Sequence, residues 1–115
     1  MRYTQRKGDY AVAKAIASFT KLGYDILLPL TESASYDLVV EQNGLLKRVQ
    51  VKYSSDHDVD LRRIHSNSNG YVVKKAKINA YDWLYILSSD EKEYLIKECL
   101  CGRRSITLND KYILK

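Results

Sequence analysis

Hydrophobic residues recur every three to four positions between Ala11 and Leu22, which predicts an amphipathic helix. The apolar positions are Ala11, Val12, Ala15, Ile16, Phe19 and Leu22. Asp9 precedes them and belongs to the residue types that favour helix N-caps, so we expect the helix to begin at Gly8-Asp9. Gly23 follows the last apolar position and predicts the end of the helix.

Two runs rich in Val and Leu flank Asn43-Gly44, which predicts a β-hairpin with a two-residue turn. Such a turn fixes the register, and continuing the pairing from the turn puts Asp37 opposite Gln50. Because side chains alternate between the faces of a strand, Lys52 shares the face of Asp37 and Gln50. The other face is expected to be the core side, and it carries Leu38, Val40, Leu45, Val49 and Val51.

The rest of the chain alternates between strand-like and polar segments. Tyr24 to Leu28 is interpreted as a buried first strand, and a short helix is expected to end within Ile78 to Tyr81. Apolar strands follow at Trp83 to Leu87 and at Glu93 to Lys97, with one edge strand after Gly102. We therefore expect a single α/β domain over residues 1–115, with a central mixed sheet and flanking helices.

The charge pattern suggests a polyanionic partner. The chain has 115 residues, a formal net charge of +5 and an isoelectric point near 9.2. No apolar run approaches the ~18 residues that a membrane span requires, and the N-terminal segment lacks the apolar stretch of a signal peptide. We expect a cytoplasmic protein without a membrane partner.

The two cysteines, Cys99 and Cys101, are one residue apart. In a strand they would point to opposite faces, so we expect free thiols. The histidines show no spacing that would complete a zinc site with them.

A carboxylate, an amide and an ammonium group converge at the open end of the hairpin, contributed by Asp37, Gln50 and Lys52. A carboxylate beside a second oxygen ligand can hold a hard ion such as Mg²⁺. A neighbouring lysine can orient a water molecule or balance charge that builds up on a phosphate. The alternative is an edge hairpin whose polar face is simply solvated.

Asp37 followed, after twelve residues, by Gln50-Val51-Lys52 resembles the signature of the PD-(D/E)XK nuclease superfamily. In that signature an Asp begins one strand and an acid-x-Lys lies on the next. Gln in the acid position resembles the branch of group I intron homing endonucleases of the cyanobacterial type. The archaeal Holliday-junction resolvases are more distantly similar. The resemblance continues in the Asp-aromatic-Leu strand at Asp82 and covers about Lys7 to Ile96.

The resemblance implies a restriction-endonuclease-like fold and DNA hydrolysis that depends on Mg²⁺ or Mn²⁺. Asp37, Gln50 and the Val51 carbonyl would hold the metal, and Lys52 would position the attacking water. Members of the family carry a Glu on the first helix, four residues after a Gly, but here that position is Val12. Asp9, three residues earlier on the same helix face, is the candidate replacement.

The resemblance also implies DNA as the partner and a homodimer or homotetramer, because cutting both strands needs two sites. The basic residues expected to contact DNA are Arg62, Arg63, Lys74, Lys75 and Lys77. Two alternatives stay open. One is a nuclease fold that binds nucleic acid or protein with weak or no cleavage, and the other is a Holliday-junction resolvase.

Overall fold

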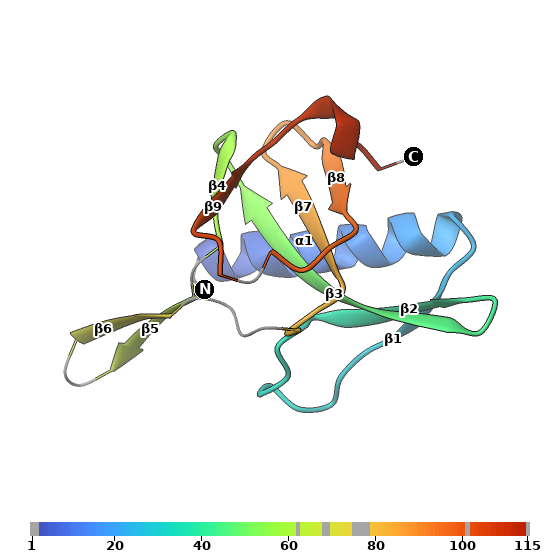
Figure 1. Cartoon of the computed structure of the whole chain (residues 1–115), viewed down its shortest axis with the longest axis horizontal. Helices are drawn as coiled ribbons and strands as arrows, with labels where there is room; N and C mark the ends of the chain where they lie inside the picture. The colour runs from blue at the N-terminus through green and yellow to red at the C-terminus, as the bar shows by residue number, and fades with distance from the viewer. Residues whose placement is uncertain (1–2, 62, 68–69, 75–78, 101, 115) are drawn as a thin grey trace.

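The computed structural model describes residues 3–61, 63–67, 70–74, 79–100 and 102–114. Within them, one α-helix, α1 (Tyr3–Lys21), packs on a five-stranded mixed sheet (Figure 1). The sheet has the order β1-β2-β3-β7-β8, and only β3 and β7 are parallel. Its strands are β1 (Asp25–Leu27), β2 (Leu38–Gln42), β3 (Leu45–Ser54), β7 (Trp83–Ser88) and β8 (Glu93–Ile96).

Two small antiparallel ribbons complete the described chain. The strands β4 (Asp58–Asp60) and β9 (Ser105–Thr107) form the first ribbon. The strands β5 (Arg63–Asn67) and β6 (Gly70–Lys74) form the second, which projects away from the body of the molecule (Figure 1). The strand β9 confirms the strand expected after Gly102. A 3-10 turn, η1 (Asp110–Tyr112), follows it.

The helix α1 begins earlier than its sequence signal. It starts at Tyr3, so Asp9 lies inside the helix as an exposed residue, and the prediction that it caps the N-terminus was wrong. A glycine inside a helix costs about 0.5–1 kcal/mol relative to Ala, yet the helix runs through Gly8. Tertiary contact helps to hold the extra turns, since the Lys7 ammonium lies 5.3 Å from the centroid of the Tyr53 ring.

The end of α1 is as predicted. Gly23 has φ +94°, and the N–H groups of Gly23 and Tyr24 donate to the carbonyls of Thr20 and Phe19. This pair of bonds is the Schellman arrangement that a glycine after a helix favours. Among the described residues, no helix is long and apolar enough to cross a membrane.

The hairpin between β2 and β3 has the predicted register. Asn43 and Gly44 have φ of 56° and 79°, and the pairing runs from Gln42↔Leu45 to Leu38↔Val49. The expected core face was wrong at one position, because Leu45 is 67% exposed. The hairpin tip extends beyond the elements that cover the rest of the sheet.

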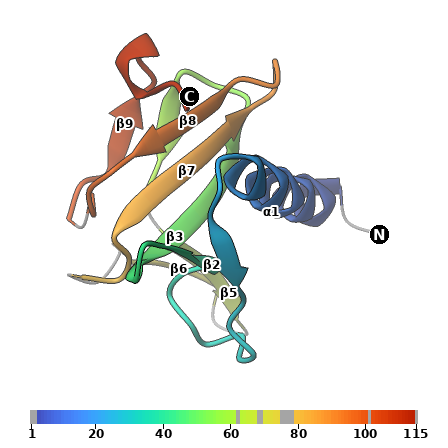
Figure 2. The same cartoon turned by 90° about the vertical axis from the view of Figure 1, so that its right-hand side faces the viewer.

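Figure 2 shows α1 on one side of the sheet and β9 on the other. A hydrophobic core lies on each face. On one face, Ala11, Ala15 and Phe19 of α1 pack against alternate residues of the sheet, Leu38, Val40, Val49, Val51, Tyr85 and Leu87. On the other face, Val59 and Ile106 of the β4–β9 ribbon, with Leu61 just after β4, pack in one cluster with Leu84, Ile86 and Ile96. Residues of β3 and β7 therefore alternate between a helix side and a ribbon side.

A salt bridge aligns the two parallel strands. The guanidinium of Arg48 contacts Asp82 at 3.2 Å through both Nε and Nη2. The Arg48 N–H also donates to the Asp82 side chain at Oδ2, and the Asp82 N–H donates to the Arg48 carbonyl, both at 2.9 Å. The pair therefore fixes the start of the β3–β7 pairing, which sets the position of everything beyond it on β3.

Two hydroxyl groups connect α1 and the helix side of the sheet to β8, the strand at its edge. Tyr85 is fully buried, and its hydroxyl donates to Glu93 Oε1 at 2.6 Å. Ser18 of α1 donates to the same carboxylate. Burial, and then the neighbouring Glu93, raise the pKa of Tyr85 well above its ordinary value, so this hydroxyl stays protonated and keeps donating.

Three further expectations need correction or lie partly outside the described residues. The segment at Tyr24 to Leu28 was expected to be buried, but β1 is an edge strand with Leu27 45% exposed and Leu28 58% exposed. Cys99 is disulfide-bonded, so the expected free thiol was wrong there, while Cys101 lies outside the described residues. The short helix is not seen at 79–81, and residues 75–78 lie outside the described residues.

Candidate functional site

Asp37 lies one residue beyond the end of the β2–β3 pairing. Its backbone N–H donates to the Val49 carbonyl at 2.9 Å, and its Oδ2 accepts from the Val51 N–H at 2.7 Å. Val49 and Val51 flank Gln50 on β3, so Asp37 lies beside Gln50, as the turn arithmetic predicts. Its carboxylate takes the place of a backbone carbonyl where β2 has already ended.

Gln50 and Lys52 lie on the ribbon side of the sheet. In the parallel pairing Gln50 is next to Leu84 and Lys52 is next to Ile86, and both of these neighbours belong to the core under the β4–β9 ribbon. Both site residues are half-buried, whereas Val51 between them is buried against the helix side. Lys52 therefore shares the face of Gln50 and does not enter the helix-side core.

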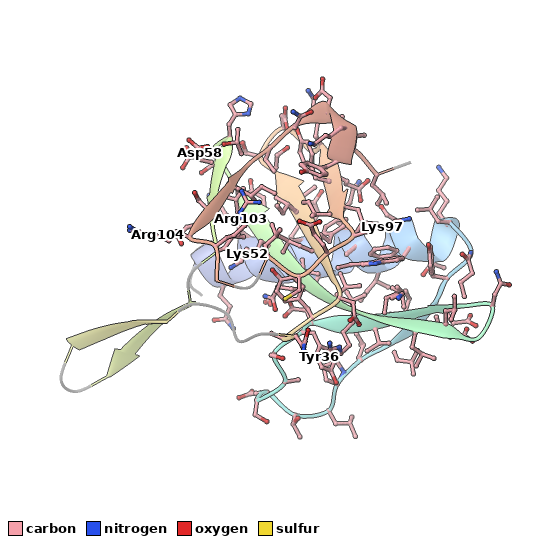
Figure 3. The ribbon with its side chains drawn as sticks, in the orientation of Figure 1. Tyr36, Lys52, Asp58, Lys97, Arg103 and Arg104 are labelled. Carbon is pink, nitrogen blue, oxygen red and sulfur yellow. The ribbon has the colours of Figure 1, made fainter. Side chains whose placement is uncertain are left out.

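A groove runs along β3 past the point where β2 stops. Its volume is about 500 Å³, and it is lined by Lys7 and Gly8 of α1, by residues 51 to 56 and by β4. Its lining residues include Lys52 and three acidic residues, Asp56, Asp58 and Asp60. Figure 3 labels Lys52 and Asp58, which come from β3 and β4. Asp58 Oδ1 accepts a hydrogen bond from the Thr107 hydroxyl at 2.6 Å, which fixes its orientation.

The oxygen donors around Asp37 suit a hard divalent ion but carry little charge. Asp37 offers a carboxylate, Gln50 an amide oxygen and Val51 a main-chain carbonyl, which are the ligand types that Mg²⁺ takes. Across the described residues, no group of three or more His, Cys, Asp or Glu side chains could hold a metal ion. A bound ion would therefore depend on oxygen atoms from its substrate or from water.

Val12, the position at which the resembled family carries a Glu, lies on the helix side of the sheet. Val12 is half-buried and packs against the helix-side core that contains Val51. It lies one turn along α1 from Gly8, which lines the groove. Asp9, the candidate replacement, is exposed next to Gly8.

Of the basic residues expected to contact DNA, the structure describes the backbone of two, Arg63 on β5 and Lys74 on β6. Arg63 and Lys74 pair with each other across β5 and β6. Arg62, Lys75 and Lys77 lie outside the described residues. A ribbon that extends from the body provides an element that can reach along a ligand larger than the domain.

The sequence pattern missed Lys7 as a residue of the groove. Lys7 precedes Gly8-Asp9, where the helix was expected to begin, so the sequence pattern did not predict which way its side chain would point. For Asp58 and Asp60 the sequence does hold a signal, because alternate positions of a strand share a face. It does not show that their strand pairs with β9, or that they line the same groove as Lys52.

Comparison with known proteins gives a consistent result. A family model described as PD-(D/E)XK endonuclease matches residues 2–108. A solved structure of a bacterial homing endonuclease, I-Ssp6803I, is 31% identical with a TM-score of 0.79, over 95% of this chain and 80% of that chain. A comparison with curated protein sequences finds no significant match. The resemblance to these nucleases and the expected α/β fold class are confirmed.

Proposed function

The chain belongs to the PD-(D/E)XK endonuclease family, and on this basis we propose that it is a metal-dependent, homing-endonuclease-like enzyme that hydrolyses DNA phosphodiesters. One observation carries the proposal. The Asp37 carboxylate is held by the Val51 N–H at 2.7 Å, on the strand that presents Gln50 and Lys52 from one face. A solvated hairpin edge would not need a carboxylate bonded into the neighbouring strand.

Asp37, Gln50 and the Val51 carbonyl would hold the metal ion, with Mg²⁺ or Mn²⁺ as the candidates. When bound, the ion would polarise the phosphate and stabilise its developing negative charge. The protein contributes the fixed geometry of the three oxygen donors. The bond to Val51 restrains the Asp37 side chain before any ligand arrives, so little orientation has to be gained on binding.

Lys52 would act on the attacking water and on the phosphate. Its stem lies along the ribbon side of the sheet while the side chain lines the groove, so its ammonium can approach a ligand there. Preorganised positive charge is most valuable where negative charge develops in the transition state. Lys7 adds a second ammonium to the wall of the same groove.

DNA is the proposed substrate, with Arg62, Arg63, Lys74, Lys75 and Lys77 as backbone contacts. A net charge of +5 supports a polyanionic ligand. Cutting both strands would require two copies of this small domain, as a homodimer or homotetramer.

Val12 favours a second candidate function, in which the nuclease fold binds nucleic acid without cutting it. The helix position that supplies an acid in the family is apolar here and packs on the core. A site with one carboxylate has less charge to attract a metal ion.

The two functions are separated by incubating purified protein with supercoiled plasmid in Mg²⁺, in Mn²⁺ and in chelator. The enzyme hypothesis expects nicked or linear DNA with either metal and none with chelator. Binding of labelled duplex without cleavage in any metal would support the second function. Absence of both binding and cleavage would overturn both.

A further inference from the structure

Two adjacent arginines, Arg103 and Arg104, are presented on a tight turn before β9. The turn begins at Gly102, whose φ of +86° suits a residue without a side chain. The Arg103 N–H closes it by donating to the Leu100 carbonyl at 3.2 Å.

The turn is anchored on both sides. Leu100 and Ile106 are buried in the ribbon-side core. The Arg104 carbonyl accepts from the Leu61 N–H at 2.8 Å, which continues the β4–β9 pairing by one bond. The backbone that carries the two side chains is therefore held on the same side of the sheet as Gln50 and Lys52.

This position is next to both parts of the proposed DNA site. Leu61 follows β4, which forms a wall of the groove that contains Lys52. Two residues after Leu61 the chain enters β5 of the projecting ribbon. Figure 3 shows Arg104 and Lys52 toward the side of the molecule from which that ribbon projects, and Lys97 away from it.

Within the described part of the chain, the guanidinium groups of Arg103 and Arg104 have no ion-pair partner. Both are exposed, and no described residue forms an ion pair or a side-chain hydrogen bond with either guanidinium. Arg48 provides the contrast, because Asp82 engages it through two hydrogen bonds. Arg48 is a structural arginine, whereas Arg103 and Arg104 are directed to solvent.

We infer that the Arg103–Arg104 turn is a phosphate-binding element that holds the DNA backbone beside the nuclease site. The inference rests on the proposed function. Guanidinium groups suit phosphate because their planar donors can bond two oxygens at once. The groove is lined by three acidic residues and only two lysines, so cations beyond β4 would supply further positive charge for the DNA backbone.

The test measures affinity for labelled duplex DNA between low and moderate salt, for the parent protein and for Arg103→Gln/Arg104→Gln. Each phosphate contact contributes about −0.9 to the slope of log K against log[salt]. Loss of two contacts should make the slope shallower by about 2, to a similar extent on unrelated sequences.

Lys97→Gln/Lys111→Gln is the matched control. It removes the same charge from two exposed residues that line a different cavity, between the end of α1 and the C-terminal segment. The inference expects the control to keep the parent slope.

Equal slopes for the arginine variant and the parent would overturn the inference and leave the proposed function standing. Equal losses in both double variants would also overturn it, because only net charge would matter. A parent protein that binds no DNA would instead refute the proposed function. Thermal unfolding of each variant verifies that the fold is retained.

Discussion

The carboxylate of Asp37 accepts a hydrogen bond from the backbone N–H of Val51, across the gap left where β2 ends. One side chain therefore accepts the Val51 N–H of β3 and supplies the carboxylate of the proposed site. Because β3 continues to Ser54, its later residues keep β7 as a neighbour on one edge, while a groove follows the end of β2 on the other. The two roles of Asp37 can be separated, since an amide oxygen can replace the carboxylate as acceptor but not as charge.

Asp37→Asn should abolish cleavage while DNA binding is unchanged or tighter, because the change removes negative charge that faces phosphate. Its free energy of unfolding should fall by less than that of Asp37→Ala, which leaves the Val51 N–H without its partner at a cost of about 1–3 kcal/mol. Plasmid nicking, duplex binding and urea unfolding measure the three effects. Asp25→Asn, on the exposed edge strand β1, is the control and should cleave normally. Cleavage by Asp37→Asn at the parent rate would remove Asp37 from the site.

Lys52→Ala should stop cleavage and weaken DNA binding slightly. The ammonium would be lost from the groove, where it balances charge on the phosphate, while the sheet keeps its backbone pairing with β7. Lys47→Ala is the matched control, since Lys47 is also half-buried on β3 but lies near the hairpin tip. Single-turnover cleavage at saturating DNA separates the two effects. Equal loss in both variants would point to net charge and away from a role of Lys52 in the reaction.

The central hairpin could be predicted because its information is local. Asn43 and Gly44 adopt the positive φ that their residue types allow, and the turn then sets each partner up to Leu38↔Val49. The shared face of Gln50 and Lys52 follows from the alternation of side chains along β3 alone. These two facts were enough to predict that Asp37 lies beside Gln50 and that Gln50 and Lys52 share a face.

The predictions were wrong where tertiary contacts determine the helix start or the burial of a residue. Asp9 has the chemistry of an N-cap, but the helix extends to Tyr3, and the contact of Lys7 with Tyr53 depends on where β3 ends. Leu27 and Leu45 belong to apolar runs, yet nothing in the chain order says which part of the sheet stays uncovered. The groove and the Arg104 turn depend on β4 pairing with β9, more than forty residues later.

Acid should weaken the Arg48–Asp82 pair. The Arg48 guanidinium holds the pKa of the Asp82 carboxyl below its ordinary value of 3.8. The pair therefore contributes stability above the pKa of the unfolded chain, and this contribution is lost as the pH falls through the lower folded pKa. Asp82→Asn should cost only about 0.5–1 kcal/mol at pH 7, because both side chains are more than a third exposed.

Urea unfolding at pH 7 and at progressively lower pH tests this prediction. The difference in free energy between the parent and Asp82→Asn should shrink as the pH drops below about 4. Asp110→Asn, on the exposed turn η1, is the control and lacks such a partner among the described ion pairs. A difference between parent and Asp82→Asn that does not change with pH would show that the pair adds no charge-dependent stability.

The strongest test of the missing acid is Val12→Glu. Val12 is half-buried on α1, one turn from Gly8 at the groove, so a longer side chain can carry its carboxylate out of the core. The acid should strengthen Mg²⁺ binding and raise cleavage, or create cleavage where the parent has none. Part of the apolar packing would be lost, at a cost of about 1–3 kcal/mol.

The measurement is plasmid nicking against Mg²⁺ concentration for the parent, Val12→Glu, Val12→Gln and Val12→Glu/Asp37→Asn. Val12→Gln has the same bulk without the charge and should show no gain, and the double variant should lose whatever Val12→Glu gains. Vigorous cleavage by the parent with no gain from Glu would mean that another group already fills the place. Asp9, exposed on the same face of α1, is then the residue to change, and Asp9→Asn should remove that activity. If none of these proteins cuts while all bind duplex, the missing acid is not what prevents cleavage, and the fold serves binding alone.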